Sequence, residues 1–328
     1  MTSNMIVSPA PHIRSNASTN RIMLDVLIAL VPALGVAIWV FGPRAALVTG
    51  VCAATCVFFE WAYEKLLKRK NTISDYSAVL TGVLLAYNLP VTIPLWQAIL
   101  GSFVAIILVK QLFGGLGKNF ANPAIAARIV LFLAFTDTMT TWVMPFMLPA
   151  LSVPPGAALD AITGATPLVE LIHKAAGHEY VLPGTWNLFL GVHGGCIGET
   201  SELALLAGGI YLLCRRVITW HAPLSFIAVV FILSSLIGGF EFGLLHILTG
   251  GLFLGAIFMA TDYVTTPQTN LGRVIFGVGC GLITVVIRMY GNYPEGVSFS
   301  ILFMNMLVPF INKISFKKAL GGIYERKK

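Results

Sequence analysis

The residues best suited to covalent chemistry lie in one short polar segment, 160–167, which reads DAITGATP. Gly164 permits a left-handed backbone, and Pro167 favours an extended conformation at Thr166. The segment therefore predicts a turn that carries threonine hydroxyls, inside a chain that is otherwise strongly apolar. The residues concerned are Asp160, Thr163, Gly164, Ala165 and Thr166.

Written as D-x-x-T-G-A-T, this segment resembles the signature at which a flavin transferase esterifies FMN to a threonine. Thr166 would be the acceptor, joined through its hydroxyl oxygen to the flavin phosphate. The competing interpretation is an ordinary turn without a cofactor. The motif thus gives the hypothesis of a covalently bound FMN. The rest of the chain must show whether this hypothesis fits the class of protein.

The composition predicts an all-α integral membrane protein. Hydrophobic residues make up 57% of the 328 residues and charged residues only 11%, against about 25% charged residues in a typical soluble domain. The mean hydropathy is +0.84. A helix needs about 20 apolar residues to cross the hydrocarbon core. Ten such spans are predicted: 22–41, 44–64, 76–92, 94–113, 122–138, 199–214, 222–239, 243–261, 272–290 and 297–312.

Basic residues gather on one side of this ten-span arrangement, which predicts that both termini are cytoplasmic. Only Arg44, Lys174 and Arg288 fall on the other side. The net charge of +7 needs no nucleic-acid partner, because this bias and the attraction to anionic lipid explain it. The basic residues on the cytoplasmic side are Arg14, Arg21, the run 65–70, Lys118, Arg215, Arg216, Arg273 and the tail from Lys313.

This topology divides the chain into five parts and places Thr166 outside the cytoplasm. A loop as long as 139–198 is usually functional, and 166–176 is expected to form a short amphipathic helix. The parts are a cytoplasmic segment 1–21, a membrane repeat 22–138, the extracytoplasmic loop 139–198, a second repeat 199–312 and a basic tail 313–328.

Two weak internal matches predict that the membrane helices form a 5+5 inverted repeat. LTGVL at 80–84 is echoed by LTGGL at 248–252, and the turn GKNFANPA at 117–124 by GNYPEG at 291–296. Five spans separate the halves, so equivalent helices would point in opposite directions. Such a repeat would create two related pockets at opposite membrane faces, which suits two cofactors that pass electrons across the bilayer.

The cytoplasmic turn of the first half predicts one of these pockets. A flavin ring needs flat apolar walls together with amide groups for its pyrimidine edge. Asn119 and Asn122 offer the amides, and Phe120 offers a wall. The alternative is that Asn122 only caps the helix that starts at Pro123.

Other groups give weaker indications. Ionisable residues within spans are costly and usually functional, so Asp25, Glu60 and Arg128 are candidates for ion or proton coupling. Asp25 and Arg128 could instead simply pair, or lie at the membrane interface. No CxxC motif and no Cys/His cluster with metal spacing occurs. We therefore expect no metal site and no iron–sulfur cluster held by this chain alone, and we assign no catalytic residue.

At this point a resemblance to a known family is clear. The segments DAITGATP, KQLFGGLGKNFANPA, FMATDYVTTP and YPEGVSFSILFMN resemble those of the D subunits of Rnf complexes and, more distantly, the B subunits of Na⁺-pumping NADH:quinone reductases. The likeness extends from about Pro11 to Lys318. The B subunits carry a longer N-terminal extension that is missing here, which favours the Rnf family.

The resemblance implies FMN bound to Thr166 and a second, non-covalent flavin, riboflavin, near Asn119 and Asn122. It also implies a multi-pass subunit of the bacterial cytoplasmic membrane, in a complex that couples electron transfer between reduced ferredoxin and NAD to Na⁺ or H⁺ transport. Its partners would be iron–sulfur and FMN subunits, with a flavin transferase for maturation. A flavin-free solute transporter or channel and a purely structural assembly subunit remain the alternatives.

Overall fold

The computed structural model of the protein describes residues 18–69, 72–143, 145–146, 167–168, 184–291 and 295–316. Within these ranges the regular structure is helical, and the only pairing of β type is an isolated bridge between Pro90 and Cys196. The predicted all-α class is confirmed. The segment 160–166, for which FMN attachment is predicted, lies outside the described residues.

The first half of the chain folds into two long helices followed by shorter ones. The side chain of Ser18 caps α1 by accepting a hydrogen bond from the backbone N–H of Arg21. Gly42, at a φ of 77°, then turns the chain into α2, which begins with Pro43. The elements are α1 (Thr19–Phe41), α2 (Pro43–Leu66), η1 (Ile73–Asp75), α3 (Ser77–Tyr87), α4 (Leu95–Phe103), η2 (Val104–Gln111), α5 (Pro123–Ala134) and α6 (Thr136–Met139).

The second half repeats this mixture of long and short helices. Ser201 and Thr269 cap α9 and α13 through their side-chain oxygens. Two segments, η2 in the first half and η5 in the second, are π-helices, which frequently occur at functional sites. The elements are α8 (Thr185–Leu190), η4 (Ile197–Glu199), α9 (Glu202–Cys214), α10 (His221–Gly238), α11 (Phe240–Ile247), α12 (Leu252–Leu254), η5 (Gly255–Met259), α13 (Asn270–Tyr290) and α14 (Val297–Ser315).

Five of the described helices are long and apolar enough to cross a membrane, namely α1, α2, α10, α13 and α14. A sixth candidate consists of α11 followed by α12 and η5, which are bent by 65° at the break between them. The segments α3, α4 with η2, α5 and α9 are apolar but shorter, at 10 to 17 residues. The protein is therefore a multi-pass membrane protein with five or six full-length candidate spans in its described part.

Three of the predicted spans are interrupted: 76–92, 122–138, where α5 and α6 are separated at Phe135, and 243–261. The first and the last of these breaks have a local cause. The span 76–92 ends as a helix at Tyr87, because Pro90 disfavours helical conformation in the residue before it. The span 243–261 breaks at the glycine pair Gly250 and Gly251, where Gly250 has a φ of 71°. Irregular backbone at membrane depth must be buried in protein, and the segment 89–93 is indeed almost completely buried.

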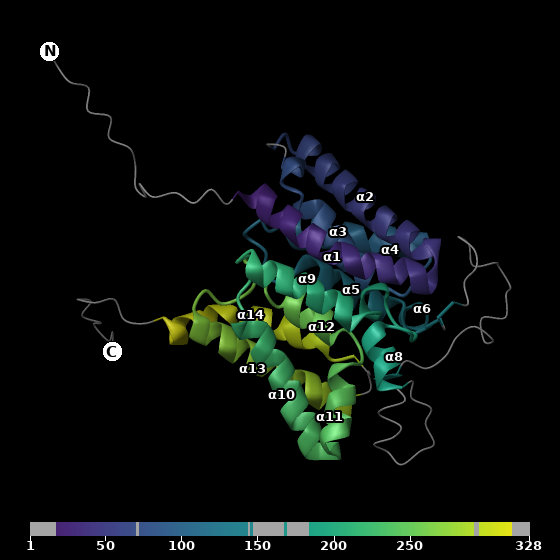
Figure 1. Ribbon diagram of the computed structural model, residues 1–328. Coiled ribbons are helices and arrows are strands. Elements are labelled where there is room, and N and C mark those ends of the chain that lie inside the picture. Colours follow the sequence, from purple (N-terminus) through teal and green to yellow (C-terminus); the bar gives the residue numbers. More distant parts are fainter. Residues whose placement is uncertain are drawn as a thin grey trace, which may run out of the picture.

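The helices of the two halves meet along a central layer (Figure 1). In that view α1 to α4 lie in the upper part, α10, α11 and α13 in the lower part, and α5, α9, α12 and α14 between them. Contacts between the halves join α1 to α9 and α5 to α14. Turns between these helices therefore come together at the ends of the bundle and can build sites there.

Candidate functional site

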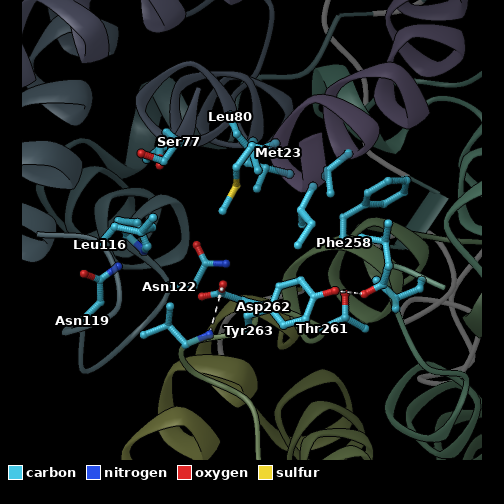
Figure 2. Close-up of a pocket in the computed structure, with 18 of the residues that line it drawn as sticks. Met23, Ser77, Leu80, Leu116, Asn119, Asn122, Phe258, Thr261, Asp262 and Tyr263 are labelled. Atoms are coloured by element: carbon cyan, nitrogen blue, oxygen red, sulfur yellow. Dashed lines mark hydrogen bonds between the residues drawn. The ribbon is translucent and has the colours of Figure 1, made fainter. Parts of the chain in front are cut away.

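A cavity of about 760 Å³, counted with the space at its open mouth, lies where several of these turns meet (Figure 2). Its walls come from the start of α1, from α3, from the turn before α5, from the end of α9 and from the turn after η5. Most of the wall is apolar and includes Ile22, Met23, Val26, Leu80, Leu84, Leu116, Leu212, Val217, Ile218 and Phe258.

Asn119 and Asn122, the two amide residues of the predicted pocket, both line this cavity. Asn122 is 3% exposed, and its Oδ1 accepts a hydrogen bond of 3.0 Å from the backbone N–H of Ala124, so it also caps α5. The Oδ1 of Asn119 is buried and has no hydrogen-bond partner among the described residues. Because a buried acceptor without a partner costs about 1–3 kcal/mol, this oxygen is a natural contact for a donor on a ligand.

Phe120, the third residue predicted for this pocket, does not line the cavity. Its side chain is exposed and packs against Phe113, with ring centroids 4.8 Å apart. The prediction that Phe120 supplies a flat wall is therefore not supported by its position. Phe258 and Tyr263 are the aromatic residues that line the cavity instead.

Asp262 adds a carboxyl group to the polar part of the cavity, and Figure 2 shows its side chain next to that of Asn122. Its Oδ2 accepts a hydrogen bond of 3.0 Å from Thr265 Oγ1. Burial raises the pKa of the Asp262 carboxyl above its ordinary value, although hydrogen bonds from Thr265 and from backbone N–H groups oppose the shift. The cavity thus offers amide and carboxyl groups on one side of an otherwise apolar space.

A buried ion pair reaches the same cavity from α2 and η2. Lys110, which lines the cavity, places its Nζ 2.8 Å from both carboxylate oxygens of Glu60. The two side chains are 1% and 0% exposed. Glu60 was predicted as a coupling candidate, whereas Lys110 was missed because it is a single charge near the end of an apolar run.

Asp25 and Arg128 do not pair with each other, so that alternative was wrong. Asp25 accepts hydrogen bonds from Tyr211 Oη at 3.1 Å and from Arg215 Nη2 at 3.2 Å. Arg128 points to a different region, where its Nη2 lies 3.7 Å from Glu199 Oε1 and also pairs with Glu295. Asp25 therefore joins α1 to α9, while Arg128 joins α5 to the start of α9 and α14.

Comparison with known proteins decides the family. The pattern of the NQR2, RnfD, RnfE family matches residues 6–321. The chain belongs to this family. It is 45% identical, over 328 residues, to the D subunit of the Na(+)-translocating ferredoxin:NAD(+) oxidoreductase complex of Acetobacterium woodii, with 99% of this chain and 98% of the relative covered.

Other members of the family are also similar along nearly their whole length. The D subunit of the ion-translocating oxidoreductase complex of Stutzerimonas stutzeri is 42% identical, with 93% of each chain covered. The D subunit of the proton-translocating ferredoxin:NAD(+) oxidoreductase complex of Clostridium ljungdahlii is 40% identical, with 94% of each covered. The resemblance drawn from the sequence motifs is thereby confirmed.

The family's predicted attachment residue, Thr166, is outside the described residues, as are Asp160, Thr163, Gly164 and Ala165. The two residues that follow it, Pro167 and Leu168, are buried. They line a second, smaller cavity together with Trp142, His193, Gly194, Glu199, Gly250 and Glu295. The chain immediately after Thr166 is thus packed against a cluster of ionisable groups that includes the partners of Arg128.

Three side chains in this second region could offer metal ligands, since ligand atoms of Cys196, Glu199 and Glu295 lie within 4.8 Å of one another. The guanidinium of Arg128 lies among them, with its Nη2 3.7 Å from Cys196 Sγ and from Glu199 Oε1. It further donates hydrogen bonds to Asn88 at 3.0 Å and to Ser298 at 2.7 Å. The positive charge required by the two carboxylates is therefore supplied by Arg128.

His193 is a further group at this second cavity that the sequence did not single out. It is 3% exposed, and its Nε2 has no hydrogen-bond partner among the described residues. Burial lowers the pKa of its imidazole, against smaller opposing effects of the Gly194 carbonyl and Glu199. A histidine in a long loop carries no spacing signal, so only the fold reveals that it lies near Glu199.

Proposed function

We propose that this chain is the D subunit of an ion-translocating ferredoxin:NAD oxidoreductase of the Rnf type. In this role it would relay electrons between FMN attached to Thr166 and a second, dissociable flavin, riboflavin, in the large cavity. The subunit role follows from the full-length similarity to relatives with that name. The B subunit of an Na⁺-translocating NADH:quinone reductase is the nearest alternative within the same family.

The observation that supports the second flavin best is the cavity beside Asn119. It has an apolar wall and a buried amide oxygen without a partner in the described part of the chain. An isoalloxazine matches these features of the cavity. Its ring system is flat and apolar, while its pyrimidine edge carries an N–H donor and carbonyl acceptors. The residues present therefore fit the group that the family implies.

The roles of the protein side chains follow from their positions. Leu80, Leu84 and Phe258 would exclude water from the ring, and the two asparagines would orient its polar edge. When bound, a flavin supplies one- and two-electron chemistry, while the protein sets its position and potential. Lys110 and Asp262, at the wall of the cavity, are charged or titratable groups that can influence that potential.

The finer architecture is part of this proposal. We place both termini on the cytoplasmic side, with ten spans related as a 5+5 inverted repeat. In support, the packing joins the first helices of the two halves, α1 and α9, and the last ones, α5 and α14. Apart from the middle of α3, the segments that line the large cavity are turns or helix ends that would lie towards the cytoplasmic face in this arrangement.

The FMN attached to Thr166 would lie at the extracytoplasmic face, opposite the dissociable flavin. The support is the D-x-x-T-G-A-T match and the burial of Pro167 and Leu168 beside Glu199 and Glu295. A covalent bond would retain the cofactor at a face where a dissociable one would be lost. The transported ion stays open, since the relatives named above include one called Na⁺-translocating and one called proton-translocating.

The test is to purify the subunit after co-expression with a flavin transferase and then to denature it. We expect a visible flavin absorbance band, of which one part stays with the polypeptide and an equal part is released. A preparation without any flavin absorbance would refute the proposal and favour a transporter, a channel or a structural subunit. Retained flavin without released flavin would refute only the second site.

A further inference from the structure

The ion pair of Glu60 and Lys110 is connected to the protein surface by two short chains of hydrogen bonds. Lys110 Nζ donates to both oxygens of Glu60 at 2.8 Å and to Ser77 Oγ at 2.6 Å. Lys110 and Ser77 both line the large cavity. Each chain therefore begins at the cavity wall.

The first chain runs through Glu60 to Thr72. The Thr72 hydroxyl donates to Glu60 Oε1 at 3.0 Å and also lies within hydrogen-bonding contact of Glu64. Because a threonine hydroxyl has one proton and two lone pairs, it can serve only one of these carboxylates at a time. Thr72 is exposed to solvent, whereas Glu60 and Glu64 are buried.

The second chain is shorter and runs through Ser77 to Asp75. The Ser77 hydroxyl accepts from Lys110 Nζ and donates to Asp75 Oδ1 at 2.5 Å. Asp75 is partly exposed. Both chains thus lead from a fully buried ammonium group to residues that water can reach, without a gap in the hydrogen bonding.

We propose that these two chains conduct protons between the surface and the large cavity, with Lys110 as the group that delivers the proton to the bound cofactor. This inference rests on the proposed function, because it requires a redox cofactor in the cavity. Reduction of such a cofactor brings negative charge into a low-dielectric site, where a proton must follow if the charge is to be neutralised. Lys110 is the cationic side chain at the cavity wall within the described residues.

The proton balance is simple and changes no oxidation state of the protein. Electrons reach the cavity from the reduced flavin that the proposed function attaches to Thr166. Lys110 Nζ releases one proton into the cavity and becomes a neutral amine. One proton then enters from water at Thr72 or Asp75 and passes by Glu60 or Ser77 to that amine, so every side chain regains its starting state.

Several helices supply the groups around Lys110. The groups that face it are Glu60 and Cys56 from α2, Ser77 from α3, its neighbour Gln111, and Asp262 at the cavity wall. Gln111 Nε2 donates to Glu60 Oε1 at 3.0 Å, which holds that carboxylate in place while the lysine charge varies. A buried ion pair is weak evidence for a role in stability, and its link to the surface is what indicates proton transfer.

The experiment interrupts both hydrogen-bond chains in the purified complex. The double variant Thr72→Val and Ser77→Ala removes one hydroxyl from each. The matched control removes two hydroxyls elsewhere, with Thr92→Val and Ser225→Ala, which among the described residues bond only to backbone carbonyls. The flavin is reduced by light, and proton uptake is followed with a pH-indicator dye in a stopped-flow cell. Released flavin is quantified in each preparation.

We expect the first variant to take up protons about 100-fold more slowly per bound dissociable flavin, while the control keeps the wild-type rate. A second variant, Glu60→Gln with Lys110→Met, removes both charges together, so that neither is left buried alone, and should also abolish the fast phase. Fast uptake in both variants with flavin present would overturn the proton path alone. A wild-type complex without dissociable flavin would overturn the proposed second site and, with it, this path.

Discussion

Replacing Asn119 by leucine separates ligand binding from protein stability better than any other change in the large cavity. In the free protein the Asn119 Oδ1 is buried and has no partner among the described residues, so its loss removes no hydrogen bond there. The free energy of unfolding should change by no more than about 0.5 kcal/mol. A bound flavin, however, would lose an acceptor and keep an unpaired donor, at a cost of about 1–3 kcal/mol.

That cost corresponds to a Kd for the dissociable flavin that is about 5- to 150-fold higher. The assay removes the flavin, titrates it back and follows its fluorescence, while thermal unfolding in detergent reports stability. Asn122 is a poorer target, because its Oδ1 also caps α5 at Ala124 and losing a cap costs about 0.5–2 kcal/mol. Phe120→Leu is the control, since Phe120 is exposed and outside the cavity. Wild-type flavin affinity in a folded Asn119→Leu variant would show that the oxygen does not contact the ligand.

Four further outcomes are expected. Thr166→Ala should abolish the flavin fluorescence of the denatured subunit while Thr163→Ala retains it, and peptide mass mapping that finds the flavin on another residue would contradict the motif assignment. Reporter fusions at Gly177 and at the C-terminus should give opposite signals, and matching signals would show that the spans between them are miscounted. Arg128→Met leaves the buried Glu199 and the partly buried Glu295 without their cationic partner and should lower the free energy of unfolding by about 3–5 kcal/mol, measured by thermal unfolding; an unchanged midpoint would mean that Arg128 is not their partner. The pKa of Asp262 is raised in the folded state, so the unfolded state loses this proton first as pH rises above 3.8, and the free energy of unfolding should fall over that pH range. Asp262→Asn should reduce this fall. An identical pH profile of stability in the variant would exclude the raised pKa.

Hydropathy located the helices well but not their lengths or breaks. Every predicted span contains a helix, because burial of apolar side chains in a membrane requires a satisfied backbone. Yet the predicted span 76–92 ends as a helix at Tyr87, and 243–261 is two segments bent by 65°. A window of apolar residues cannot distinguish one long helix from two short ones, since both bury the same side chains. The proline at Pro90 and the glycines at Gly250 and Gly251 were the signals of these breaks.

In the candidate site, residues that are close in sequence could be placed together in advance, whereas contacts between distant residues could not. Asn119 and Asn122 could be predicted because a turn and a helix start bring both amides to one place within four residues. The partners of charged residues could not, because they are set by which helices pack together. Glu60 and Lys110 are 50 residues apart, and their pairing depends on α2 lying against η2. Inside a low-dielectric protein each charge must find a partner, so an ionisable residue in an apolar span predicts that a partner exists, and only the fold decides which one.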